Sequence, residues 1–385
     1  MRFACVLLAA LAGLGCSSAK ANPGAAEDSG APEGGGGSGG EAGMIGQTNC
    51  IPSPANFEVP GNQCDDDANG VVDDEPTCDQ QEVVTGDAAA FARAIGICQT
   101  LTGAEDPRWG LVSVEYKGAY STGSPVSDVQ HGILSSYGDV IAPREGAFLG
   151  ALSTGWARPY DNAIDPNNPQ ENPFKGGYAA QPGDPTDDAP PGFPKAAIGC
   201  PIDSTVHDFI DVKVVLKVPA NAQGFSFDFD FWSSEWPEYV CSSYNDSFIA
   251  YLTETGAAAA NVSFDGKGNP VSVNNGYLDR CTPGTPTGCN VVNGPHAVST
   301  CPSGEAELGG TGFGAPRQAY CTSLSTPGAA TGWLTSTAPV TPGDTIALEW
   351  MLWDTGDQNY DSTALLDHFQ WIATPTTTGT QRPPK

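Results

Sequence analysis

Residues 224–232 read GFSFDFDFW, and this stretch decides the fold class. Phenylalanine alternates with serine and aspartate, so an extended segment has one apolar and one polar face. Residues 211–218, DVKVVLKV, and residues 345–353, TIALEWMLW, follow the same two-residue period. Period two with one polar face predicts half-buried antiparallel strands.

The segments outside these strands indicate how the strands are arranged. Residues 158–199 and 254–322 are long and rich in Gly, Pro, Asn and Asp, so we expect surface loops stapled by cysteines. Residues 87–98, DAAAFARAIGIC, form the one clear helix pattern, with Asp87 as N-cap. The sequence therefore predicts a mainly β fold: an antiparallel β-sandwich, jelly-roll-like, with one short N-terminal helix and long disulfide-stapled loops.

Charge limits the partners of this chain. The 385 residues include 45 Asp and Glu against 16 Lys and Arg, which gives a formal charge of −29. Such a field repels phosphate backbones and attracts cations, so nucleic-acid binding is not expected. The 48 Gly and 33 Pro are more than a globular chain usually has but fewer than a wholly disordered chain has.

The first sixteen residues indicate export. Arg2 precedes an apolar run at 5–14 that is too short to span a bilayer as a helix. The small residues that end at Cys16 resemble a bacterial lipobox, which implies cleavage before Cys16 and a lipid on its sulfur. Ser17 then favours sorting to the outer membrane or cell surface of a Gram-negative bacterium. The alternative is an ordinary secretory signal that is cut elsewhere.

Composition divides the rest of the chain. Residues 17–49 include ten glycines and almost no large apolar residues, so this segment is expected to be a flexible tether. The predicted organisation is a signal peptide at 1–15, a lipidated tether at 16–49, an Asp-rich loop at 50–80, a helical connector at 81–108, the β-sandwich at 109–373 and a disordered tail at 374–385.

The cysteines agree with an oxidising compartment. Apart from Cys5 and Cys16 their number is ten, which allows five disulfides. No CxxC pair occurs, which argues against redox catalysis and a zinc ribbon. Spacing favours local bridges such as Cys64–Cys78 and Cys281–Cys289, although other pairings remain open. The cysteines expected in disulfides are Cys50, Cys64, Cys78, Cys98, Cys200, Cys241, Cys281, Cys289, Cys301 and Cys321.

Residues 64–78, CDDDANGVVDDEPTC, carry the most specific metal signal. Oxygen ligands alternate before Gly70, as in a calcium loop, but Pro76 stands where an EF-hand has its glutamate. The arrangement resembles thrombospondin type 3 repeats and a metal-binding motif of bacterial surface proteins related to MopE. The alternative is a solvated acidic turn closed by a disulfide. The predicted calcium ligands are Asp65, Asp67, Asn69, the Val71 carbonyl, Asp73 and Asp74.

A longer resemblance covers the predicted sandwich. Residues 229–252, FDFWSSEWPEYVCSSYNDSFIAYL, resemble the signature of the choice-of-anchor L domain of bacterial surface proteins. Residues 332–371 resemble a second block of that family, and residues 131–157 resemble a third block more weakly. The resemblance implies secretion and surface display, and it implies no reaction.

Acidic residues in these blocks suggest further metal sites. One group follows the strand at 224–232, and Asp354, Asp357 and Asp361 crowd a second loop. They are expected either to bind further calcium at the loop ends or to cap turns by bonding to backbone amides. The residues considered as additional calcium ligands are Glu235, Glu238, Asn245, Asp246, Asp357 and Asp361.

The sequence favours a protein that is not an enzyme. Glu235 and Glu238 could form an acid pair for glycoside hydrolysis, but no GxSxG, HExxH or phosphate-loop motif occurs. We expect a lipid-anchored surface protein with a structural or adhesive role, bound to another surface protein. The alternative is a module that binds surface polysaccharide, and a surface glycoside hydrolase comes third. The candidate sugar-stacking rings are Trp232, Trp236, Trp350 and Trp353, of which Trp232 and Trp353 lie on polar strand faces.

Overall fold

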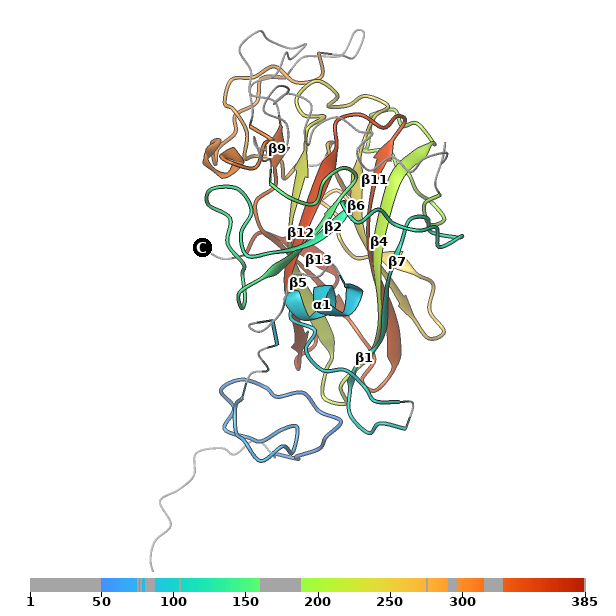
Figure 1. The fold of residues 1–385 in the computed structure, drawn as a ribbon, viewed down its shortest axis with the longest axis vertical. Helices are drawn as coiled ribbons and strands as arrows, with labels where there is room; N and C mark the ends of the chain where they lie inside the picture. Colours follow the sequence, from blue (N-terminus) through green and yellow to red (C-terminus); the bar gives the residue numbers. More distant parts are fainter. Residues whose placement is uncertain are drawn as a thin grey trace, which may run out of the picture. The chain divides into compact units, whose positions relative to one another are not determined.

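The alternating segments of the sequence form the central strands of two antiparallel sheets (Figure 1). The computed structural model describes residues 50–383 except 75, 77, 80–86, 104, 160–187, 275, 290–296 and 315–327. Within these ranges the chain is mainly β, with one short helix near the start, as predicted. The predicted signal peptide, the tether and Cys16 lie outside the described residues, as does most of the loop at 158–199.

The first sheet, sheet A, contains six of the described strands in the order β1-β4-β11-β6-β7, with β8 also paired to β6. All of its neighbouring strands are antiparallel. Its strands are β1 (Gly110–Lys117), β4 (Val206–Lys217), β6 (Ser247–Glu254), β7 (Ala260–Asn261), β8 (Val271–Ser272) and β11 (Thr345–Thr355).

The second sheet, sheet B, contains seven of the described strands in the order β13-β10-β5-β12-β3-β2, with β9 also paired to β5. Its pairings are antiparallel as well. Its strands are β2 (His131–Leu134), β3 (Leu149–Ser153), β5 (Gly224–Ser233), β9 (Ala329–Ala330), β10 (Leu334–Pro339), β12 (Ser362–Ile372) and β13 (Gly379–Gln381). A 3-10 turn, η1 (Ala306–Leu308), contacts β9.

The apolar faces of the two sheets pack against each other. The phenylalanines of β5 are buried with the apolar residues of β4, β6 and β11 in one core. The ring of Phe227 lies 5.4 Å from that of Trp350 in β11, and the ring of Phe229 lies 4.8 Å from that of Phe248 in β6. These ring pairs join sheet B to sheet A, so the predicted sandwich is confirmed.

The alternation in β5 predicts that its polar face is exposed to solvent, but in the structure two aspartates of this face are buried. Asp228 and Asp230 are both buried, because loops cover this face of sheet B. The Nε of Arg144 lies 3.0 Å from Asp228 Oδ2, and the Thr331 hydroxyl donates to Asp230 Oδ1 at 3.1 Å. These two aspartates therefore hold loop residues onto the sheet instead of facing water.

The predicted helix is present but shorter. Helix α1 (Ala88–Ala94) begins at Asp87, whose carboxylate accepts a hydrogen bond from the Ala89 amide. The helix ends before Gly96, which has a φ of +96°. Phe91 packs over Gly150 of β3, where a Cβ atom would lie 2.4 Å from the phenylalanine ring. Glycine at this position lets the helix pack directly on sheet B.

The disulfides differ from the local bridges that spacing favours. Cys64 pairs with Cys50 and not with Cys78, and Cys281 pairs with Cys301 and not with Cys289. Distance along the chain does not fix distance in space, and the Cα atoms of these two pairs lie 5.6 and 5.3 Å apart. Cys289 is also disulfide-bonded, while Cys321 lies outside the described residues. The other described bridges are Cys78–Cys98 and Cys200–Cys241.

The predicted disordered tail at 374–385 is wrong for its described part. Strand β13 pairs with β10 between Gly379 and Gln381. The guanidinium of Arg382 then donates to the carbonyl of Thr331 at 2.6 Å. Backbone pairing orders this polar segment although it has few apolar side chains. Among all the residues that the structure describes, no helix has both the length and the apolarity needed to cross a bilayer.

Asp228 also forms a pH-sensitive contact with His368. Burial alone would raise the pKa of Asp228, but hydrogen bonds from His368, Thr335 and Arg144 bring it below its usual value. The hydrogen bond to Asp228 raises the pKa of His368, and Glu145 and Asp367 act in the same direction. His368 contributes below its unfolded pKa of about 6.5, and Asp228 contributes above about 4. The contact is therefore strongest between these pH values.

We expect His368→Gln to destabilise the fold by about 1–2 kcal/mol at pH 5.5 and by less at pH 9, because His368 is charged only at the lower pH. Urea unfolding at both pH values measures the difference. Thr335→Val removes a neutral donor to the same carboxylate and should cost the same at both. An equal loss for His368→Gln at both pH values would contradict the charged contact.

Candidate functional site

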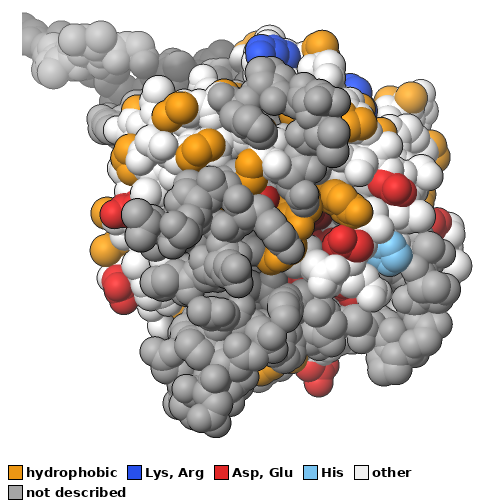
Figure 2. Space-filling view, turned by 90° about the horizontal axis from the view of Figure 1, so that it is seen from above, with side chains coloured by type: hydrophobic (Ala, Val, Ile, Leu, Met, Phe, Trp, Pro, Cys, Tyr) orange, Lys and Arg blue, Asp and Glu red, His pale blue; other side chains and the backbone are white. Residues whose placement is uncertain are grey.

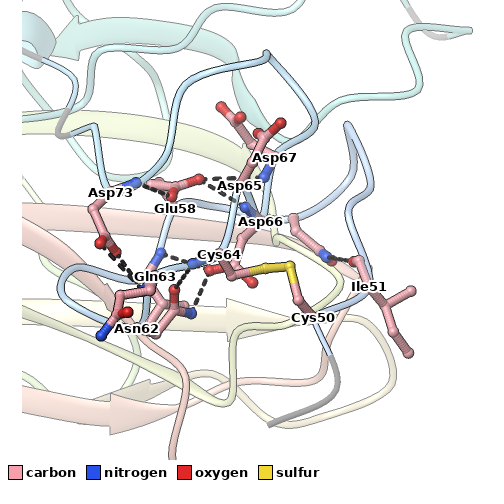
Figure 3. Close-up of a disulfide and its surroundings, with 12 residues drawn as sticks. Cys50, Ile51, Glu58, Asn62, Gln63, Cys64, Asp65, Asp66, Asp67 and Asp73 are labelled. Atoms are coloured by element: carbon pink, nitrogen blue, oxygen red, sulfur yellow. Dashed lines mark hydrogen bonds between the residues drawn. A yellow bond between two sulfur atoms is a disulfide. The ribbon is translucent and has the colours of Figure 1, made fainter. Parts of the chain in front are cut away.

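Glu58 organises the acidic loop before α1 (Figure 3). Glu58 is 7% exposed, and its carboxylate accepts hydrogen bonds from the amides of Asp66 at 2.9 Å, Asp73 at 2.7 Å and Asp67 at 3.4 Å. Burial raises the pKa of Glu58, although these three amides oppose the rise. One side chain therefore joins the two halves of the loop.

Glu58 also completes a group of three carboxylates. Glu58, Asp65 and Asp67 each offer one oxygen, and these oxygens lie within 4.8 Å of one another. Burial raises the pKa of Asp67, the Asn69 amide opposes this, and the carboxylates of Asp74 and Asp65 add to it. Carboxylate oxygens gathered in this way match the preference of calcium for hard ligands. Sequence reasoning missed Glu58 because it precedes Cys64 and lies outside the repeated aspartate pattern.

The other predicted ligands play different parts in the loop. The amide of Asn69 donates to Asp65 Oδ1 and Asp67 Oδ1, both at 3.0 Å, and its side-chain Nδ2 donates to Asp74 Oδ2 at 3.0 Å. The carboxylate of Asp73 accepts from the Gln63 amide at 3.1 Å and is not part of the three-carboxylate group. Val71 is exposed. The structure thus brings Asp65 and Asp67 together and leaves Asp73 out of the group.

A cavity of about 300 Å³ lies beside this loop. Glu58 and Asp67 line it together with Trp109 and Trp371. The two tryptophan rings are 6.2 Å apart in an edge-to-face arrangement, and both are half-buried. The cavity therefore has carboxylates of the acidic loop and aromatic surface of the sandwich on its walls.

The acidic residues of the block at 229–252 are buried. Glu235, Glu238, Asn245 and Asp246 are all shielded from solvent, and Glu235 Oε2 accepts a weak hydrogen bond from the Asp246 amide at 3.4 Å. Neither glutamate of the proposed acid pair is on the surface. These residues can hold the end of the sandwich, but in this arrangement they do not face a bulky substrate.

The second predicted group is divided by the fold. Asp361 is buried near Asp246, and the Asp246 carboxylate accepts from the Ser362 hydroxyl at 2.7 Å. Asp357 is partly exposed and accepts from the Asn359 amide at 2.9 Å. Sequence reasoning missed Asp208, a buried carboxylate within β4. The signal that could have identified Asp208 is its position among the apolar residues of this strand.

The tryptophans considered for sugar stacking are not surface residues. Trp232, Trp350 and Trp353 are completely buried, and Trp236 is 3% exposed. Trp353 stacks on Phe209, and Trp232 packs against Tyr137 and Phe313. Their strands alternate with polar residues in the sequence, but the residues packed around these rings exclude solvent from them. The prediction that Trp232 and Trp353 are available to a sugar is wrong.

The described surface agrees with the charge of the chain. On the face drawn in Figure 2, Lys and Arg side chains gather at one edge, whereas Asp and Glu side chains lie at several places across it.

Comparison with known protein families supports the resemblance to the choice-of-anchor L domain found in residues 229–252. Residues 214–369, about two fifths of the chain, match the family model of the Choice-of-anchor L domain. The match runs from within β4 to within β12, so it is narrower than the 109–373 expected and leaves out α1 and the acidic loop. Neither a curated protein nor a solved structure matches the chain. The domain match suggests a surface-associated protein.

We expect Glu58→Ala to loosen the acidic loop, because three amides lose their acceptor. Hydrogen exchange at Asp66 and Asp73 should quicken about tenfold, which corresponds to ~1.4 kcal/mol. Mass spectrometry of peptides covering 58–74 measures this change. Glu105→Ala changes an exposed glutamate and should leave these peptides unaffected. Unchanged exchange in Glu58→Ala would mean that the loop is held by other contacts.

Proposed function

We propose that this chain is a non-catalytic, lipid-anchored cell-surface protein whose β-sandwich is stabilised by calcium and whose role is structural or adhesive. The observation that carries the proposal is the Choice-of-anchor L match over residues 214–369. The four described disulfides support export, because such bridges persist in oxidising compartments. In this proposal the anchor is a lipid on Cys16, and its support is the lipobox-like sequence that ends at this cysteine.

The placement of the acidic residues supports a role without catalysis. Glu235 and Glu238, the pair that could act on a glycosidic bond, are buried in the end of the sandwich. A general acid has to reach the bond that it protonates, within about 3 Å or through one water molecule. A pair closed off from solvent fits a bracing role better than hydrolysis.

The calcium proposal rests on the three-carboxylate group. Glu58, Asp65 and Asp67 supply hard oxygen ligands on a loop whose ends are held by Cys50–Cys64 and Cys78–Cys98. A loop held in place loses less conformational entropy when it binds an ion. Extracellular calcium modules commonly have dissociation constants of about 10⁻⁴–10⁻³ M, which such a partly exposed group can match.

One observation favours the alternative that the protein binds polysaccharide. The cavity beside the acidic loop combines carboxylates with the half-buried rings of Trp109 and Trp371. Aromatic rings stack on the apolar faces of sugars, and carboxylates or a calcium ion bind their hydroxyl groups. The adhesive role and this alternative differ in the molecule that the protein binds, which is another protein in the first case and a polysaccharide in the second.

We expect calcium to raise the melting temperature of the protein by several degrees over the value in EDTA. A ligand at 100 times its dissociation constant adds about 2.7 kcal/mol of stability. Asp67→Asn should reduce this rise, because it removes a ligand of the three-carboxylate group. Asp66→Asn makes the same charge change outside the group and should keep the rise. An identical calcium response in the wild type and Asp67→Asn would contradict a calcium site in this loop.

The lipid anchor has a separate test. When the full chain is expressed in a Gram-negative host, we expect it in the outer-membrane fraction with incorporated palmitate. Cys16→Ser should release it from that fraction, whereas Cys5→Ser, a cysteine within the apolar run, should not. Digestion of intact cells with protease then reports surface display. A membrane-bound Cys16→Ser chain without palmitate would contradict lipid anchoring at this cysteine.

A further inference from the structure

Carboxylates from both sheets meet at one end of the sandwich. Asp208 lies within β4 and Asp354 within β11 of sheet A, and Asp246 directly precedes β6 of the same sheet. Asp361 directly precedes β12 of sheet B. The Ser362 hydroxyl donates to Asp246 Oδ2 at 2.7 Å, so this cluster of four aspartates crosses from one sheet to the other.

The cluster is shielded from solvent. Asp208 is 3% exposed, Asp246 0%, and Asp354 and Asp361 1% each. Neither carboxylate oxygen of Asp361 has a hydrogen-bond partner within the described residues. A Cβ atom on Gly155 would lie 1.9 Å from Asp361 Oδ2, so glycine there leaves room for the carboxylate in the interior. An unpaired carboxylate at this depth costs several kcal/mol unless something neutralises it.

The four carboxylates act on one another. Burial raises the pKa of Asp361, and Asp208 and Asp246 raise it further. Burial likewise raises the pKa of Asp354, with added contributions from Asp246, Asp361 and Asp208. A printed contact agrees with this closeness: the Thr355 amide, next to Asp354, donates a hydrogen bond to Asp246 Oδ1 at 3.2 Å.

The backbone of β4 departs from a regular strand to contribute Asp208. The pairing of β4 with β11 shifts between Leu352 and Asp354, and Asp208 at this bulge has a φ of +49°. A bulge changes the direction of a side chain, and a left-handed residue that is not glycine stores strain. The strain serves to bring one more carboxylate to a cluster that is already acidic.

We propose that Asp208, Asp246, Asp354 and Asp361 bind a calcium ion that joins the two sheets at this end of the sandwich. The site goes beyond the calcium loop of the proposed function, because it shares no residue with it. A cation relieves all four charges at once, whereas a shared proton relieves one pair. Calcium accepts ligands from protein oxygens alone, while magnesium keeps several waters that a buried cluster has little room for.

Binding requires the cluster to contract. Within the described residues only Glu58, Asp65 and Asp67 place three ligand atoms within 4.8 Å of one another. The four aspartates thus stand farther apart than ligands around a single ion. Rotation of their side chains toward the ion closes this distance, and their mutual attraction to the ion supplies the driving force.

The experiment measures calcium bound by the full chain with its acidic loop disabled. Glu58→Gln together with Asp67→Asn removes the loop group, and equilibrium dialysis against calcium followed by atomic absorption counts the remaining ions. We expect one calcium per chain in this background. Adding Asp361→Asn should remove it or weaken its Kd at least tenfold. Adding Asp230→Asn, an equally buried aspartate outside the cluster, should leave it unchanged.

Two results would overturn the proposal. The first is a loop-disabled chain that binds no calcium and melts at the same temperature in calcium and in EDTA, which means that protons alone neutralise the cluster. The second is unchanged binding when Asp361→Asn is added. If that variant fails to fold, Asp354→Asn takes its place, and the calcium response of the loop-disabled parent still decides the question. These results do not depend on whether the acidic loop binds calcium, because the loop group is already removed from the chain that is tested.

Discussion

The contact between the phenylalanines of β5 and the apolar face of sheet A is the interaction on which the rest of the structure depends. Phe227 meets Trp350, and Phe229 meets Phe248, so each ring fixes the distance between the sheets. Burial of one such side chain stabilises a fold by about 1.5–3 kcal/mol. Because β5 is a central strand of sheet B, this contact also fixes which residues its other face presents to the covering loops.

The same constraint explains why so many carboxylates lie inside. Strict alternation places Asp228 and Asp230 opposite the phenylalanines, and covering loops bury both. Asp228 is balanced by Arg144 and His368. The Asp361 carboxylate at the end of the sandwich, by contrast, has no hydrogen-bond partner among the described residues. In a chain with few basic residues, cations from the medium are the remaining source of positive charge, and both proposed calcium sites use it.

The sequence predicted features that depend on local pattern. The period-two strands, the Asp87 cap of α1 and the sandwich follow from side-chain alternation and helix chemistry, and the structure agrees. The disulfide partners and the burial of Trp232 could not be predicted, because both depend on how distant loops fold back over the sheets. Glu58 was missed because it joins its carboxylate partners only in space. Asp208 was missed although its position within the apolar strand β4 was a signal.

Strand β13 forms one edge of sheet B and limits the pairing of this edge with strands of other molecules. It covers the outer edge of β10 and is only three residues long, and Pro383 follows shortly after it. A short edge with a nearby proline offers few free backbone groups to a strand of another molecule. Copies that are crowded together can therefore lie side by side without their sheets merging into one, so dense packing does not by itself lead to aggregation along this edge.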